Sequence, residues 1–66
     1  MNVTINGETR EVPDGLTVQA LIEHLGLRTD ATVAEINGSI VDRAAYSDRP
    51  IAAGDEVELV QFVGGG

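Results

Sequence analysis

Two Asn-Gly dipeptides constrain the fold of this chain more than any other feature of its sequence. Asn6-Gly7 follows the alternating segment Val3-Thr4-Ile5, and Asn37-Gly38 follows Thr32–Ile36. Asn and Gly both tolerate the positive φ values that two-residue hairpin turns require. We therefore expect two antiparallel hairpins. Their strands are expected at residues 3–5, 8–12, 32–36 and 39–41.

One amphipathic helix is expected between the two hairpins. Pro13-Asp14-Gly15 ends the preceding strand, and Thr17 can cap the N-terminus of the helix. Gly26 supplies a C-terminal stop. Leu16 and Leu21 have the spacing of a hydrophobic staple, which would fix how the chain enters the helix. The apolar face at helical spacing consists of Val18, Leu21, Ile22 and Leu25.

A last strand is expected near the end of the chain. Residues 56–62 alternate and are rich in β-branched side chains, and Ala53-Gly54-Asp55 is typical of a turn before them. Residues 42–50 are expected to be irregular or to form a single helical turn. The order ββαβββ predicts an α+β roll, in which a mixed sheet packs on one helix. We expect one domain at residues 1–63 and a flexible tail at residues 64–66.

The charge and cysteine content exclude several classes of function. The chain has eleven acidic residues, four arginines and no lysine, so its formal net charge is -7. A phosphate backbone or an anionic membrane surface would repel such a chain. Without cysteine, it has no disulfide, no thiolate zinc site and no cysteine nucleophile. No secretory signal or membrane-length apolar run is visible, so we expect a cytoplasmic protein that is a monomer when free.

The residues that usually carry catalysis are few. His24 is the only imidazole, and its place near the end of the predicted helix favours an ordinary surface role. A catalytic triad would need His24 beside Ser39 or Ser47, and no nucleophile elbow accompanies either serine. We therefore expect no hydrolase activity of the chain's own.

Acidic residues gather at the start of the last predicted strand, where a metal site is conceivable. Strand alternation places Glu56 and Glu58 on one face, while Asp55 belongs to the turn. Neither the number of ligands nor the loop of a calcium hand is present, so a solvated face is the simpler interpretation. The chain also lacks the glycine-rich loop that holds ATP phosphates. We expect no bound metal or cofactor.

The sequence ends in three glycines, Gly64-Gly65-Gly66, directly after an apolar strand. A frayed terminus is one interpretation. The other is that side-chain-free residues thread a narrow channel and present the carboxylate of Gly66 to another enzyme. That carboxylate could attack the α-phosphate of ATP held by a partner, giving an acyl adenylate. The adenylate could then accept sulfur from a persulfide, or pass through a thiol to an amine.

The chain resembles the ThiS family of sulfur carrier proteins, which are ubiquitin-like β-grasp proteins of thiamin biosynthesis. Residues 34–41, Ala-Glu-Ile-Asn-Gly-Ser-Ile-Val, are similar to the family pattern A-x-I-N-x-x-I-V. Arg43 and Tyr46 follow them, Gly54-Asp55 opens the last strand, and Gly64-Gly65-Gly66 closes the chain. The likeness covers essentially the whole sequence. It also implies that the first and last strands are parallel neighbours.

The resemblance implies a protein co-substrate, not an enzyme. A ThiF-like adenylyltransferase would consume ATP to adenylate Gly66, a persulfide donor would supply sulfur, and a ThiG-like thiazole synthase would take it. Gly64 and Gly65 would be presented to the partner active site with Gly66.

Strand alternation predicts where a partner binds near the tail. If Val57 and Leu59 face the helix, then Val60 and Phe62 face outward among acidic residues. With Val63, they are the predicted partner-binding residues. The alternative is that Phe62 folds back over a sheet edge.

Three other functions remain open at this point. The chain could carry sulfur for another pathway, such as molybdopterin or amino-acid synthesis, although no proline precedes the terminal glycines as it tends to in molybdopterin carriers. It could instead be a ubiquitin-like modifier of other proteins. Last, it could be a plain binding module whose glycine tail is inert.

Overall fold

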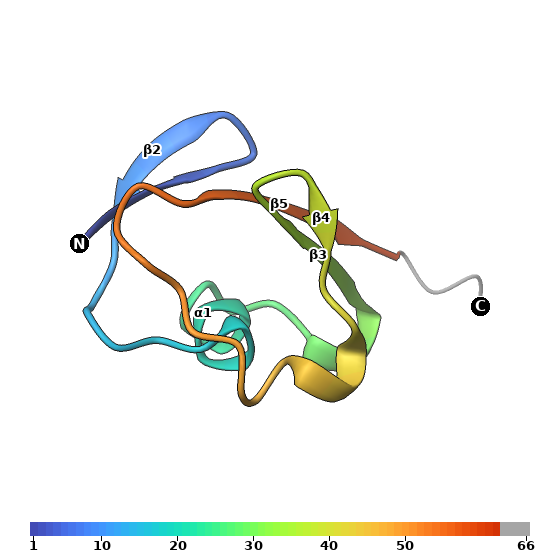
Figure 1. Cartoon of the computed structure of the whole chain (residues 1–66). Coiled ribbons are helices and arrows are strands. Elements are labelled where there is room, and N and C mark those ends of the chain that lie inside the picture. The colour runs from blue at the N-terminus through green and yellow to red at the C-terminus, as the bar shows by residue number, and fades with distance from the viewer. Residues whose placement is uncertain (63–66) are drawn as a thin grey trace.

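The computed structural model describes residues 1–62, which form a five-stranded mixed sheet and one α-helix (Figure 1). The predicted α+β roll of order ββαβββ is confirmed. The predicted boundary at residue 63 lies outside the described residues. The elements are β1 (Asn2–Ile5), β2 (Glu8–Glu11), α1 (Val18–His24), η1 (Thr29–Ala31), β3 (Thr32–Ile36), β4 (Ser39–Ile40), η2 (Arg43–Ala45) and β5 (Glu56–Gln61).

Both predicted hairpins are confirmed. Asn6 and Gly7 have φ values of 49° and 82°, and Asn37 and Gly38 have φ values of 51° and 85°. Positive φ at both central residues matches the right-handed twist of the flanking strands, which is why these dipeptides suit the turns. β1 pairs antiparallel with β2, and β3 pairs antiparallel with β4.

The last strand lies at the centre of the sheet, whose strand order is β2-β1-β5-β3-β4. β5 pairs in parallel with β1, where Ile5 lies opposite Val57. On its other side, β5 pairs antiparallel with β3, where Ala34 lies opposite Leu59. The parallel pairing of the first and last strands is therefore confirmed, and β5 joins the two hairpins into one sheet.

Helix α1 has the predicted cap and stop. The Thr17 hydroxyl accepts a hydrogen bond from the Ala20 N–H at 3.2 Å, which satisfies one of the unpaired amides of the first turn. Gly26, at φ 75°, reverses the chain so that the Leu27 N–H reaches the Ile22 carbonyl at 3.0 Å. Because the helix has only seven residues, its stability comes mainly from packing on the sheet.

One face of the sheet packs on α1 and the irregular segment that follows β4, and the other face carries no helix within the described residues (Figure 1). Among residues 1–62, no helix is long and apolar enough to cross a membrane. The buried apolar core consists of Val3, Ile5, Val12, Val18, Leu21, Ile22, Ala34, Ile36, Tyr46, Ile51, Val57 and Leu59.

Two side chains from the segment after β4 complete the edge of β3. The buried Tyr46 hydroxyl donates to the Thr32 carbonyl at 2.9 Å and accepts from the Ala34 N–H at 3.1 Å. The Arg43 guanidinium also donates to the Thr32 carbonyl, at 3.2 Å, and lies 5.4 Å from the centre of the Tyr46 ring. Since β4 pairs only with the last two residues of β3, these side chains satisfy backbone groups that a longer neighbour strand would have bonded.

Candidate functional site

The predicted reactive residue, Gly66, and the neighbouring positions Gly64, Gly65 and Val63 lie outside the described residues. The described part of the site is therefore the end of β5 and Phe62, which leads to them. The Phe62 N–H donates to the Ala31 carbonyl at 2.8 Å and so continues the pairing with the β3 side of the sheet. The backbone is thus held as far as Phe62, two residues before the predicted tail at residues 64–66.

The two hairpin asparagines hold β5 from both sides. The Asn6 side chain accepts from the Leu59 N–H at 2.8 Å and donates to the Leu59 carbonyl at 3.2 Å. It therefore pairs with β5 beyond the point where β1 ends, as another strand residue would. Asn37 accepts from the Glu56 N–H at 2.9 Å and donates to the Asp55 carboxylate at 3.1 Å. Each asparagine thus makes a turn and also positions the strand that leads to the tail.

The side chains of β5 alternate between two environments, as predicted. Val57 and Leu59 are buried beneath α1, whereas Val60 is 56% exposed and Phe62 is 61% exposed. Phe62 therefore lies on the open face and does not fold back over a sheet edge. The structure brings Val60 and Phe62 together on one surface, and their role in binding a partner stays a prediction.

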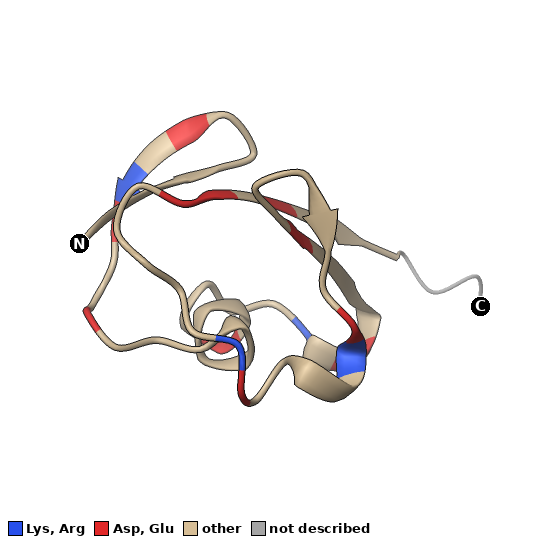
Figure 2. Cartoon of the chain, viewed as in Figure 1, with Lys and Arg blue, Asp and Glu red and all other residues tan. Residues whose placement is uncertain are grey.

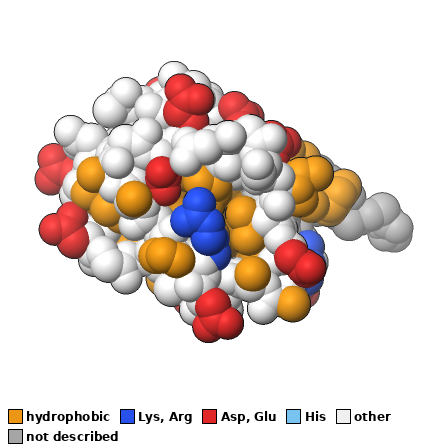
Figure 3. Space-filling view, viewed as in Figure 1, with side chains coloured by type: hydrophobic (Ala, Val, Ile, Leu, Met, Phe, Trp, Pro, Cys, Tyr) orange, Lys and Arg blue, Asp and Glu red, His pale blue; other side chains and the backbone are white. Residues whose placement is uncertain are grey.

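Ile40 extends this surface and is not among the residues that the sequence predicts for it. It is the most exposed large apolar side chain of residues 1–62, at 72%. Ile40 lies opposite Glu35 on β3, and Glu35 lies opposite Glu58 on β5, so all three side chains point to the same face. We call the residues of this surface the outer face: Val33, Glu35, Ile40, Glu58, Val60 and Phe62. Figure 3 shows apolar and acidic side chains close together near the end of β5.

The other acidic residue of the predicted cluster has a structural role. Asp55 is largely buried, and its carboxylate accepts from the Ala52 N–H at 2.8 Å and from the Asn37 side chain at 3.1 Å. It therefore closes the turn before β5. Glu56 and Glu58 are exposed on the strand, and no group of metal-ligating side chains suited to a metal ion occurs among residues 1–62.

Three of the four arginines form hydrogen bonds away from the outer face. Arg28 donates two hydrogen bonds to Asp30, at 3.1 and 2.8 Å. These hydrogen bonds and the positive charge of Arg28 lower the pKa of the Asp30 carboxyl. Arg43 donates to backbone carbonyls near β3, and Arg49 donates to the Pro50 carbonyl. Figure 2 shows acidic positions along β5 and β3 and a basic position on β2, at the other side of the sheet.

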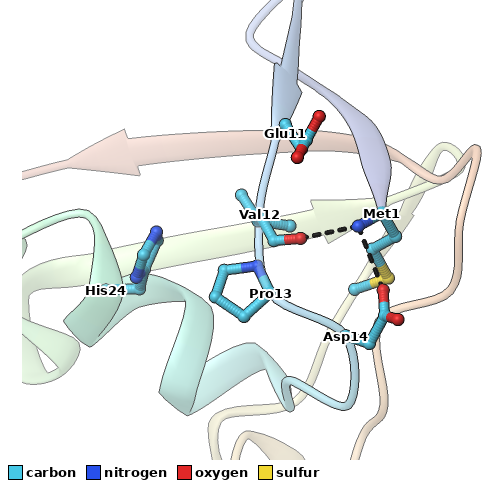
Figure 4. Close-up of a pocket in the computed structure, with 6 residues that line it drawn as sticks. All are labelled: Met1, Glu11, Val12, Pro13, Asp14 and His24. Atoms are coloured by element: carbon cyan, nitrogen blue, oxygen red, sulfur yellow. Dashed lines mark hydrogen bonds and ion pairs between the residues drawn. The ribbon is translucent and has the colours of Figure 1, made fainter.

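His24 lies at the end of α1 and lines a shallow recess, in which the ammonium of Met1 donates to the Val12 carbonyl at 2.7 Å and lies 3.0 Å from the Asp14 carboxylate (Figure 4). These contacts join the first residue to the end of β2. Neither Ser39 nor Ser47 lines this recess, so the structure does not bring His24 and a serine together there. The recess is lined by Met1, Glu11, Val12, Pro13, Asp14 and His24.

A mixed sheet with a central parallel pair, wrapped over one helix, defines a ubiquitin-like β-grasp protein. The model of the ThiS family matches residues 3–66. The sulfur carrier protein ThiS of Escherichia coli is 30% identical over 66 residues, which cover all of both chains. The crystal structure of the thiamine biosynthesis protein ThiS from Geobacter metallireducens is 33% identical, covers both chains completely and superposes with a TM-score of 0.85. The chain belongs to the ThiS family.

Longer proteins also contain a region similar to this chain. A thiazole synthase of Paramagnetospirillum magneticum is 38% identical over 66 residues, and one of Magnetococcus marinus is 32% identical. The chain spans only 20% of the length of each of these relatives.

Proposed function

We propose that this chain is a sulfur carrier protein of thiamin biosynthesis and that the carboxylate of Gly66 carries the sulfur. The observation that supports this most strongly is the match to the ThiS family, which extends through Gly66. Two thiazole synthases contain a region similar to the chain, which supports delivery of the sulfur to a ThiG-like synthase.

The proposed chemistry takes place on the carboxylate of Gly66 in the active site of a partner. A carboxylate oxygen attacks the α-phosphorus of ATP bound by a ThiF-like adenylyltransferase, pyrophosphate leaves, and an acyl adenylate forms. A persulfide sulfur then attacks the acyl carbon and AMP leaves, giving an acyl disulfide. A second thiol attacks the outer sulfur of that disulfide and releases the thiocarboxylate. ATP is consumed by the partner, and the carrier needs no cofactor of its own.

The described residues support a positioning role for the rest of the domain. The Asn6 and Asn37 side chains hold β5, and the Phe62 N–H bonds the Ala31 carbonyl, so the approach to the tail has a fixed direction. Val60 and Phe62 are exposed beside it. In the proposal, they dock on the adenylyltransferase together with Val63, while Gly64, Gly65 and Gly66 enter its active site.

Intact-mass spectrometry tests the proposal. The chain is incubated with ATP, a ThiF-like adenylyltransferase and a persulfide donor, and a variant lacking Gly66 is treated identically. The proposal predicts a mass gain equal to the exchange of one oxygen for sulfur, and no gain in the deletion variant. No gain with an enzyme that converts another carrier would contradict it. ATP-dependent attachment to other proteins would favour a modifier instead.

A further inference from the structure

Two carboxylates face each other on the outer face. Glu35 and Glu58 are directly opposite on the antiparallel strands β3 and β5, so their Cβ atoms are separated by about 5 Å. Ile40 lies beside Glu35 on β4, and the neighbouring row of the sheet consists of Val33 opposite Val60. The acidic pair is therefore bordered by apolar side chains on two sides.

The described part of the chain does not neutralise this pair. The ion pairs among residues 1–62 join the Met1 ammonium to Asp14 and Arg28 to Asp30. Arg43 bonds the Thr32 carbonyl, on the opposite edge of β3 from β5. Like charges directly opposite in a sheet are destabilising, so the free domain retains a repulsion that a cation from outside would relieve.

We propose that the adenylyltransferase docks on the outer face with an arginine placed between Glu35 and Glu58. A guanidinium has donors in a planar fork and can bond both carboxylates, which a single ammonium does less well. Apolar side chains around that arginine cover Ile40, Val60 and Phe62, because these are the large apolar side chains exposed on this surface. The inference rests on the proposed function for the identity of the partner.

The charge of the outer face favours the adenylyltransferase over a second copy of the chain or a nucleic acid as the bound partner. A second copy of the chain, docked about a two-fold axis through this face, would bring four carboxylates together, and each copy carries a formal net charge of -7. A nucleic acid would add phosphate charges of the same sign. A basic protein surface with apolar neighbours complements both the charge and the exposed side chains of the outer face.

The test measures the dissociation constant for the adenylyltransferase by calorimetry with the full chain. The double variant Glu35→Gln with Glu58→Gln is expected to bind about tenfold more weakly, because the arginine loses both charged acceptors. The matched control is Glu8→Gln with Glu23→Gln, two exposed acids outside the outer face whose removal changes the net charge equally. The control is expected to change the constant by less than about twofold, since distant surface charges are screened by salt.

A second variant separates the apolar part of the surface from its charge. Ile40→Ser is expected to weaken binding by about threefold or more while the domain stays folded, because Ile40 is largely exposed in the free chain. Circular dichroism confirms folding of every variant. Equal affinities for the double variant and its charge-matched control would overturn the inference.

The outcomes also distinguish this inference from the proposed function. Binding of the parent chain without thiocarboxylate formation would reject the proposed function, and the variants would still test the acidic pair. Thiocarboxylate formation with unchanged binding of the double variant would reject only the inference. Absence of any binding by the parent chain would reject both.

Discussion

The two faces of β5 are made from alternate residues of one strand and do different things. Val57 and Leu59 pack beneath α1 and join the core, whereas Val60 and Phe62 remain exposed although they are equally apolar. The two faces differ in what covers them, because within residues 1–62 only one face of the sheet has a helix over it (Figure 1). Burial on the inner face stabilises the fold, and the same kind of side chain on the outer face remains available for a partner.

The largest effect should come from creating a cavity in the core, between α1 and the buried face of the sheet. Leu21 is completely buried between α1 and the sheet, so Leu21→Ala leaves a cavity and is expected to reduce the free energy of unfolding by about 2–5 kcal/mol. Val60→Ala, on the outer face, should change it by less than about 0.5 kcal/mol. Urea denaturation of both variants measures the contrast. Equal losses would show that the two faces do not differ in this way.

The next effect should come from the hydroxyl that completes the edge of β3. Tyr46→Phe removes the partner of the Ala34 N–H and one partner of the Thr32 carbonyl while keeping the ring in the core. Leaving the buried amide unpaired is expected to cost about 1–3 kcal/mol. Denaturation beside the parent chain measures this cost. An unchanged midpoint would mean that other groups satisfy the edge.

A smaller loss of stability should follow from removing the two hydrogen bonds that the Asn6 side chain forms with β5. Asn6→Gly keeps the positive φ of the turn but removes two hydrogen bonds to Leu59, which we expect to cost about 1–2 kcal/mol. Faster hydrogen exchange of the Leu59 amide would show the loss directly. If that amide stays fully protected, the side-chain pairing does not hold the strand.

On the outer face, a polar substitution should stabilise the free chain. Glu35→Gln removes the repulsion with Glu58, and we expect a gain of about 0.2–1 kcal/mol. Glu8→Gln, whose partner across β1 is Ile5, is the control. Thermal unfolding at low salt measures both. A loss of stability in Glu35→Gln alone would contradict the unrelieved repulsion.

The smallest effect concerns the pH dependence of the ion pair between Arg28 and Asp30, which lies away from both faces of β5. Arg28 lowers the pKa of Asp30, so any stabilisation from the pair is present above the unfolded-state pKa and is lost as the pH falls through the folded-state pKa. Both side chains are exposed, so we expect Asp30→Asn to unfold at the same temperature as the parent at neutral and acid pH. A clear difference at neutral pH would show that the pair matters.

Local patterns predicted most of the fold. Each Asn-Gly turn, the Thr17 cap, the Gly26 stop and the alternation of β5 depend on residues close in sequence, and the structure contains all of them. The parallel pairing of β1 with β5 came from the family resemblance, because one sequence does not determine which strands pair. The pairing of β5 with β3, which makes β5 central, was not predicted.

The features that the sequence did not predict depend on contacts between distant segments. Ile40 joins the outer face only through the register of β4 with β3 and of β3 with β5. The bonds of Tyr46 to the edge of β3 and of Asn6 to Leu59 likewise join residues far apart in the chain. The helical turn η1 has no capping side chain that would have indicated it.

Mapping the bound surface tests the contrast between the two faces most directly. Amide chemical shifts of the isotopically labelled chain are followed by NMR as unlabelled adenylyltransferase is added. We predict changes at Val33, Glu35, Ile40 and residues 58–62, and none around the recess formed by Met1, Asp14 and His24. Changes confined to the recess, with the outer face unaffected, would contradict the account.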